Sequence, residues 1–255
     1  MIELPVQRFR SFDGQELAWR ELGDANARPV LLLHGYFSTA RMNWIKFGHA
    51  AAIAARGFRV IMPDLRGHGD SARPHDPAAY PPDVLTDDAF ALIEHLALDD
   101  YDLGGYSLGG RTTVRLLARG ARPGRAIVAG MGLTGVTDVA GRRAHFAHIL
   151  DHLGEHPKFS PEWNAESFLK TTGGDPVALR LLLDSFVATP LEQVRAIATP
   201  TLVLSGDEDN DNGSAAELAA TMPDARLVLT PGGHMSAVVK PELGQAMAAF
   251  LAEGR

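Results

Sequence analysis

Short apolar runs and amphipathic stretches alternate along the chain, and together they predict strands separated by helices. The apolar runs, which are typical of strands covered on both faces, occupy residues 29–33, 58–62, 125–129, 201–204 and 226–229. The stretches with helical character lie at residues 44–55, 84–96, 108–119, from about 214 onward, and 236–252. Such alternation predicts an α/β fold with a mostly parallel sheet and helices on both of its faces.

Two details at the ends of the chain refine this picture. Residues 6–12 and 15–22 flank Asp13-Gly14, a dipeptide that tolerates the positive φ angles of tight hairpin turns. An antiparallel hairpin is therefore expected at one edge of the sheet. Near the other end of the chain, Ser236 is placed to cap the last helix.

The stretch from Met131 to Ala196 breaks the alternation. It carries helical patterns at residues 142–153, 165–171 and 177–186 but no convincing strand. An all-helical excursion between two strands indicates an insertion rather than another strand–helix unit. We therefore expect one core built from residues 1–130 and 197–255, with a helical insertion at 131–196.

Composition narrows the classes of function. Hydrophobic residues make up 45% of the 255 positions, which supports a full core, and the net charge of −7 includes no basic block that would favour nucleic acid or an anionic membrane. The chain has no cysteine, which excludes disulfides, thiolate metal sites and a cysteine nucleophile. No apolar run approaches membrane-spanning length and the first residues do not resemble a secretory signal, so a cytoplasmic protein is expected.

One serine stands in a context that suits nucleophilic catalysis. The segment Gly105-Tyr106-Ser107-Leu108-Gly109-Gly110 fits G-x-S-x-G between a short β-like run and a helical stretch. A serine hydroxyl is a weak nucleophile at neutral pH, so it must be exposed, oriented and paired with a base. A sharp strand-to-helix turn would present it, and glycine at 105 and 109 would avoid collisions between a Cβ and the neighbouring backbone.

Four further motifs follow predicted strands in order along the chain. They are Leu33-His34-Gly35-Tyr36, residues 64–71 (DLRGHGDS), residues 204–209 (LSGDED) and Pro231-Gly232-Gly233-His234. In this order, and together with the serine motif, they resemble the α/β-hydrolase family over nearly the whole chain. The resemblance implies a serine hydrolase whose nucleophile elbow carries Ser107, and it equates the helical insertion with the cap that covers the active site in that family.

The resemblance also implies a catalytic triad. Ser107 would be the nucleophile and His234, in a Pro-Gly-Gly loop after the last strand, its base, because an imidazole of near-neutral pKa can take the serine proton and return it to the leaving group. The third member is a carboxylate that orients the histidine. Residues 207–211 contain four acids, among which composition cannot choose; the family pattern G-x-x-D selects Asp209, and Asp138 is a remote alternative.

Backbone N–H groups and aromatic side chains complete the expected site. The N–H groups of Leu108 and Tyr36 are the expected oxyanion hole. Tyr36 and Phe37 either narrow the mouth of the pocket or pack in the core, and Trp163 either lines the cleft or joins the helices of the insertion. These three aromatic residues are the candidate substrate-binding side chains. His34 and His68 are expected to brace the site.

A second histidine pattern lies in the insertion. His145, His148, His152 and His156 are spaced so that they would form one stripe of a helix. With Asp151 and Glu155 nearby, a metal site is conceivable. A polar stripe that faces solvent is the preferred interpretation, so no metal and no cofactor are expected.

The main hypothesis is hydrolysis of a carboxylic ester through an acyl-enzyme on Ser107. The alternatives are a C–C bond hydrolase or lactonase that acts on breakdown products of aromatic or cyclic compounds, and a ligand receptor built on a hydrolase scaffold. Serine at 107 argues against the epoxide hydrolase and dehalogenase branches, which the resemblance says would carry aspartate there. The expected partner is a small ester-like molecule, with neither nucleic acid nor membrane, and the protein is expected to be a monomer or a homodimer.

Overall fold

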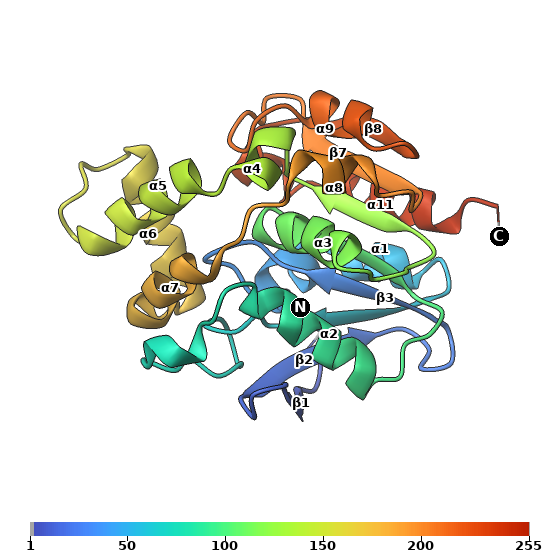
Figure 1. The fold of residues 1–255 in the computed structure, drawn as a ribbon, viewed down its shortest axis with the longest axis horizontal. Coiled ribbons are helices and arrows are strands. Elements are labelled where there is room, and N and C mark those ends of the chain that lie inside the picture. The colour runs from blue at the N-terminus through green and yellow to red at the C-terminus, as the bar shows by residue number, and fades with distance from the viewer. Residues whose placement is uncertain (1–2, 255) are drawn as a thin grey trace.

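A single sheet of eight strands forms the centre of the protein, for which a computed structural model describes residues 3–254 (Figure 1). The strand order is β1-β2-β4-β3-β5-β6-β7-β8. The strands are β1 (Gln7–Arg10), β2 (Glu16–Leu22), β3 (Arg28–Leu33), β4 (Phe58–Pro63), β5 (Asp102–Tyr106), β6 (Ala126–Ala129), β7 (Thr201–Gly206) and β8 (Ala225–Thr230). The pairs β1–β2 and β2–β4 are antiparallel and all other pairs are parallel, which confirms the predicted sheet and its hairpin edge.

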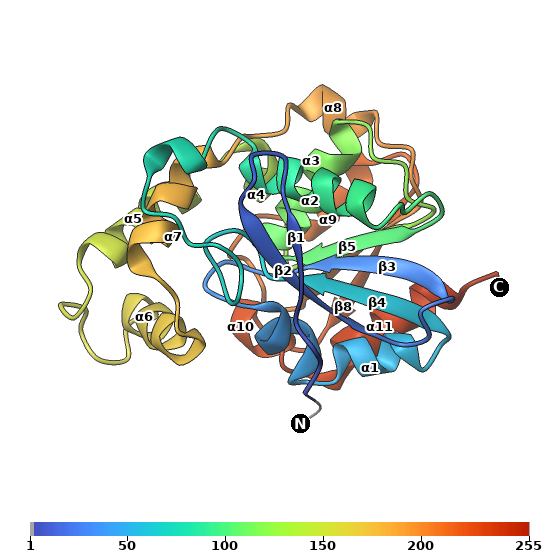
Figure 2. The ribbon, with the colours of Figure 1, turned by 90° about the horizontal axis from the view of Figure 1, so that it is seen from below.

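Helices cover both faces of this sheet (Figure 2). They are α1 (His49–Ala54), α2 (Val84–His95), α3 (Leu108–Ala118), α4 (Leu133–Thr137), α5 (Ala140–Asp151), α6 (Pro161–Thr172), α7 (Pro176–Leu182), α8 (Leu191–Arg195), α9 (Ala215–Thr221), α10 (His234–Ala237) and α11 (Pro241–Ala252). Three short turns of helix complete the set: η1 (Arg41–Ile45), which is π-helical, and the 3-10 turns η2 (Pro77–Ala79) and η3 (Leu183–Ser185). None of the helices in residues 3–254 has the length and apolar character needed to cross a bilayer.

The strand β3 shows why the sheet needs cover on both sides. Its side chains alternate between two faces, and Leu31 and Leu33 pack in a core that includes Leu92 of α2 and Leu116 of α3. The residues that alternate with them, Val30 and Leu32, belong to a second core with residues of α1 and α11. All four of these β3 side chains are fully buried. A continuous apolar run is the sequence pattern that such a strand requires.

The segment 131–196, which the structure describes throughout, contains helices α4 to α8 and no strand. Its helices α5, α6 and α7 stand apart from the layered core, at the left of Figures 1 and 2. Nevertheless, the strands on either side of the segment are direct neighbours, because Ala126 of β6 pairs with Thr201 of β7. The chain thus leaves the sheet after β6 and returns to it at the neighbouring strand β7.

Two predicted helices are wrong in their bounds. Residues 44–55 do not form one helix, because Gly48 adopts φ +81° and separates η1 from α1. Residues 236–252 are divided into α10 and α11, since Pro241 occupies the first turn of α11, where its missing N–H costs nothing. Ser236 therefore does not cap the last helix; its Oγ accepts a hydrogen bond from the N–H of Gly233 at 2.9 Å.

Candidate active site

The proposed nucleophile lies on a sharp turn between β5 and α3. Ser107 is the single residue between the two elements, with φ +55° and ψ −114°, and its N–H donates to the carbonyl oxygen of Ala129 at 2.8 Å. A Cβ on Gly105 would lie 2.2 Å from the carbonyl carbon of Gly109, and one on Gly109 would lie 2.0 Å from the carbonyl oxygen of Leu33. The turn therefore requires glycine on both sides of the serine, as the sequence motif predicts.

His234 lies between the serine and a carboxylate. Its Nε2 is 3.0 Å from Oγ of Ser107, and its Nδ1 is 2.9 Å from Oδ2 of Asp209. The side chains of His234 and Asp209 are only 8% and 3% exposed. An ionised carboxylate can only accept a hydrogen bond, so Nδ1 carries the proton and Nε2 is left to accept the serine proton. The structure thus brings together the three side chains that the sequence nominates.

The other candidate acids have different contacts. Oδ1 of Asp207 accepts a hydrogen bond from the N–H of Gly232 at 2.7 Å, which shapes the loop before His234. Asp211 is exposed and lies 4.0 Å from Arg142. Oδ1 of Asp138 accepts from the N–H of Ala140 at 2.8 Å. Within residues 3–254, Asp209 is the carboxylate found against the His234 imidazole.

Two loops are joined behind the acid and the base. The N–H of Asp207 donates to Thr230 O at 2.8 Å, and the N–H of Glu208 donates to Gly232 O at 3.1 Å. The approach is so close that a Cβ on Gly206 would lie 1.9 Å from Gly232 O. The distance between Asp209 and His234 is therefore set by backbone contacts between the ends of β7 and β8.

The loop after β3 passes directly beside the nucleophile. A Cβ on Gly35 would lie 3.4 Å from Cβ of Ser107, and the Gly35 N–H donates to Oδ1 of Asn43 at 3.0 Å. Tyr36 follows on this loop, and Leu108 is the first residue of α3, where N–H groups have no carbonyl partner within the helix. Their joint role as an oxyanion hole stays a prediction.

Comparison with known proteins agrees with this fold. A sequence model described as "Alpha/beta hydrolase family" matches residues 30–244. The chain belongs to the alpha/beta hydrolase family. The dihydrolipoyllysine-residue acetyltransferase component of the acetoin cleaving system of Pseudomonas putida is 31% identical over 268 aligned residues, which cover 97% of this chain and 70% of that protein.

Two further similarities are informative. The 2-hydroxymuconate semialdehyde hydrolase of Pseudomonas sp. (strain CF600) is 34% identical over 109 residues, which cover 43% of this chain and 38% of that protein. The crystal structure of a hydrolase from Pseudomonas aeruginosa PA01 superposes with a TM-score of 0.76 at 26% identity, and the match covers 96% of this chain and 98% of that one. The fold of this alpha/beta hydrolase is therefore shared along almost its full length.

Sequence reasoning missed a tyrosine that holds the backbone of His234 in this hydrolase. The hydroxyl of Tyr106 donates to the backbone carbonyl oxygen of His234 at 2.5 Å, and the two rings are 5.3 Å apart. The Tyr106 ring lies against Gly130, where a Cβ would come within 2.7 Å of it. Burial raises the pKa of the Tyr106 hydroxyl above its ordinary value, so it remains a donor. The middle position of G-x-S accepts many residues, and the sequence therefore carries no signal for this contact.

Two buried histidines brace the strand ends in their neutral form. His34 Nδ1 donates to Gly35 O at 2.8 Å, and its Nε2 accepts from the N–H of Leu65 at 3.0 Å. Burial lowers the pKa of His34 to about 4 and that of His68 to about 3. Their rings are 5.0 Å apart. These neutral imidazoles join the loop after β3 to the loop after β4.

A largely apolar cavity of about 290 Å³ opens beside Ser107 and His234. Tyr36 lines it as predicted, but Phe37 and Trp163 are not among its lining residues. Phe37 has φ +59°, which turns its ring onto that of Tyr36 at 4.5 Å, and Trp163 packs on Phe159 at 5.4 Å. Phe168 of α6 lines the cavity too, and side chains that the sequence did not single out supply the remaining apolar wall: Met42, Phe47, Met235, Val238 and Val239.

The histidine stripe is not a single helical face. Helix α5 ends at Asp151, so His152 and His156 lie beyond it. Their rings still approach that of His148, at 4.5 and 5.8 Å. Across residues 3–254, no group of three or more histidine, cysteine, aspartate or glutamate side chains is arranged to hold a metal ion.

Proposed function

We propose that this alpha/beta hydrolase cleaves a carboxylic ester through an acyl-enzyme on Ser107. The observation that carries the proposal is the position of one imidazole, with Nε2 3.0 Å from Ser107 Oγ and Nδ1 2.9 Å from Asp209 Oδ2. An alcohol so placed can lose its proton to Nε2 as it attacks a carbonyl carbon.

The remaining steps follow from the same geometry. The tetrahedral intermediate carries a negative oxygen, which the N–H groups of Tyr36 and Leu108 would stabilise. His234, now an imidazolium stabilised by Asp209, gives its proton to the leaving alcohol as the C–O bond breaks. Water then attacks the acyl-serine by the same route and releases the acid. Each step moves one proton through Nε2.

The test combines turnover with covalent labelling. Ser107→Ala is expected to lower kcat/KM on p-nitrophenyl acetate and butyrate by about 10³-fold or more, since removing a nucleophile leaves only binding and oxyanion stabilisation. A fluorophosphonate should add one phosphonyl group to the wild type, found by mass spectrometry on the peptide that carries Ser107. Ser167→Ala, a change on α6, is the matched control and should retain both properties. Equal turnover by the Ser107→Ala variant would refute the proposal.

A second candidate function, cleavage of a C–C bond, is supported by one relative. The name of the Pseudomonas sp. (strain CF600) protein describes a C–C bond hydrolase of a ring-cleavage product, and it is 34% identical over 43% of this chain. A lactone is a cyclic ester and would be opened by the steps above. Comparing kcat/KM for short esters, lactones and a 2-hydroxymuconate semialdehyde separates these candidates, because the best substrate should exceed the others by orders of magnitude.

A further inference from the structure

A second cavity adjoins the one that holds the catalytic side chains. It measures about 550 Å³, and Met42, Lys46 and Thr171 line both cavities. These three residues come from η1, the residue that follows it, and α6. The boundary between the two cavities therefore consists of a flexible thioether, an ammonium and a small hydroxyl side chain.

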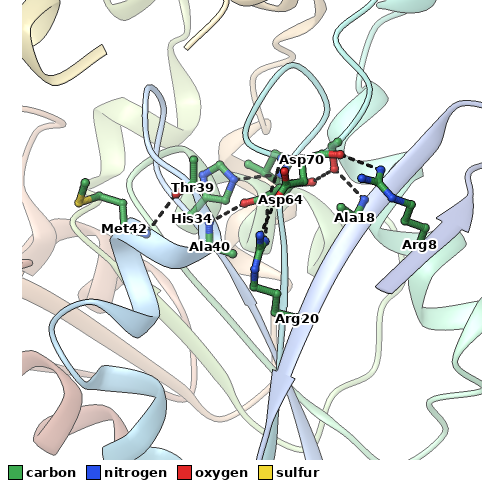
Figure 3. A network of polar contacts seen from close by, with 11 residues as sticks. Arg8, Ala18, Arg20, His34, Thr39, Ala40, Met42, Asp64 and Asp70 are labelled. Atoms are coloured by element: carbon green, nitrogen blue, oxygen red, sulfur yellow. Dashed lines mark hydrogen bonds and ion pairs between the residues drawn. The ribbon is translucent and has the colours of Figure 1, made fainter. Parts of the chain in front are cut away.

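The second cavity has an excess of positive charge. Arg20, Arg41, Lys46 and Arg73 line it, against the carboxylates of Asp64 and Asp70. Both carboxylates already bind Arg20, which reaches Asp64 Oδ2 at 2.9 Å and also pairs with Asp70 (Figure 3). Asp64 is committed further, since its Oδ1 accepts from the N–H of Ala40 at 2.8 Å. The two acids and Arg20 thus form a structural network that does not include Lys46 or Arg73.

Lys46 has the position that matters most, because it faces both cavities. Its ammonium lies 5.2 Å from the centre of the Phe47 ring, and no carboxylate of residues 3–254 pairs with it. Arg73 donates one Nη1 hydrogen bond to Gly173 O at 3.0 Å. Among residues 3–254, no carboxylate pairs with Arg73 either. Although the net charge of the protein is −7, cations gathered at a cleft raise the concentration of anions in that cleft.

We propose that Lys46 and Arg73 form a basic subsite that binds a carboxylate carried by the substrate away from its scissile ester. The inference rests on the proposed ester hydrolysis and names its substrate class: apolar esters that also bear one carboxylate. Asp64 and Asp70 line the same cavity, so a single negative charge is favoured over a dianion. The apolar first cavity takes the chain that joins the ester to this carboxylate.

The first test compares esters that differ only in this charge. Monomethyl succinate, adipate and suberate are matched with their dimethyl esters, and acetate esters of ω-hydroxy acids are matched with the corresponding methyl esters. In at least one series the wild type is expected to prefer the anionic ester, with kcat/KM about fivefold higher or more. The preference should fall as salt is added, since partly exposed charges are screened.

Variants assign the preference to the subsite. Lys46→Gln should reduce the ratio of anionic to neutral kcat/KM by about fivefold, mainly through KM, whereas Lys46→Arg should keep most of it. Lys158→Gln removes the same charge from an exposed position outside both cavities and should retain the wild-type ratio. A ratio that Lys46→Gln and Lys158→Gln change equally would show a general charge effect and overturn the proposal.

A binding measurement keeps this inference separate from the proposed function. Titration calorimetry of monomethyl and dimethyl adipate into the Ser107→Ala variant needs no turnover. Tighter binding of the monoester, lost on adding Lys46→Gln, supports the subsite even if esters are not the substrates. Equal affinities for the two esters, together with no charge preference in either kinetic series, would refute the subsite while leaving ester hydrolysis by Ser107 intact.

Discussion

The hydroxyl of Tyr106 donates a hydrogen bond of 2.5 Å to the main-chain carbonyl of His234, a residue 128 positions further along the chain. Tyr106 immediately precedes Ser107 at the end of β5. A residue at the end of β5 therefore holds the backbone of His234, so the distance between the Ser107 hydroxyl and the His234 imidazole depends on the position of this strand. This contact acts through position and does not touch the reacting atoms.

Tyr106→Phe should lower kcat by about three- to tenfold, because the lost hydrogen bond of about 1 kcal/mol lets the His234 loop move. Steady-state kinetics with a p-nitrophenyl ester distinguish positioning from stability. A positioning role lowers kcat and leaves KM nearly constant. Tyr80→Phe removes another hydroxyl, which donates to Pro74 O at 2.8 Å, and serves as control. A Tyr106→Phe enzyme with a lower melting temperature but unchanged kcat would show that the contact is only structural.

Asp209→Asn and Asp207→Asn should have very different effects. An amide at 209 can donate to Nδ1 and favour the wrong tautomer of His234, so we expect kcat to fall by about 10²- to 10⁴-fold. An asparagine at 207 can still accept from the N–H of Gly232, so a loss below about tenfold is expected. Steady-state kinetics at neutral pH measures both. Similar mild losses in the two variants would remove Asp209 from the triad.

Stability should decrease in mild acid because His34 and His68 are buried as neutral imidazoles. Burial lowers the folded-state pKa values to about 4 and about 3, whereas an unfolded histidine titrates at about 6.5. Between these values the unfolded chain binds more protons, so the free energy of unfolding falls as pH drops from about 6.5 towards 4. The slope is at most about 1.4 kcal/mol per pH unit for each histidine.

Urea denaturation at a series of pH values between neutrality and the acid range measures this slope. His34→Gln should reduce the pH dependence, since glutamine does not titrate, although it also lowers stability at neutral pH. A free energy of unfolding that stays constant through this range would contradict the neutral, buried state of the two histidines.

Gly206→Ala should damage the joint between the acid loop and the base loop. The new methyl group would lie 1.9 Å from Gly232 O, so the loops must separate. We expect a loss of about 2 kcal/mol or more in unfolding free energy, together with reduced kcat. Gly141→Ala, in α5, places its methyl group in open space and should be neutral or slightly stabilising. Equal stability of both variants would contradict the close approach.

The parts of the molecule that depend on local pattern could be predicted from the sequence. Apolar runs marked β3 and β4 because a strand covered on both faces admits few polar residues. The motif at residues 105–110 nominated Ser107, and the resemblance to the alpha/beta hydrolases selected Asp209 and His234 in loops that parallel strands deliver to one edge. Glycine at 105 and 109 reports a backbone approach that no other residue permits.

What the sequence did not reveal depends on contacts between distant segments. The Tyr106 hydrogen bond and the placement of Lys46 between two cavities leave no periodic pattern. Phe37 was nominated for the pocket by its neighbourhood, but a positive φ turns its ring into an aromatic stack. The last helix was predicted as continuous because apolar spacing persists through Pro241, although the chain restarts there.

β6 and β7 pair with each other on either side of the 131–196 segment, so its helices α5, α6 and α7 form no part of the sheet. Ser107, Asp209 and His234 also lie outside this segment, in the loops that follow β5, β7 and β8. Phe168 and Thr171, from α6, nevertheless line the cavity beside Ser107 and His234. Exchanging helices α5, α6 and α7 is therefore expected to alter which molecules fit this cavity while the contacts among Ser107, Asp209 and His234 stay in place.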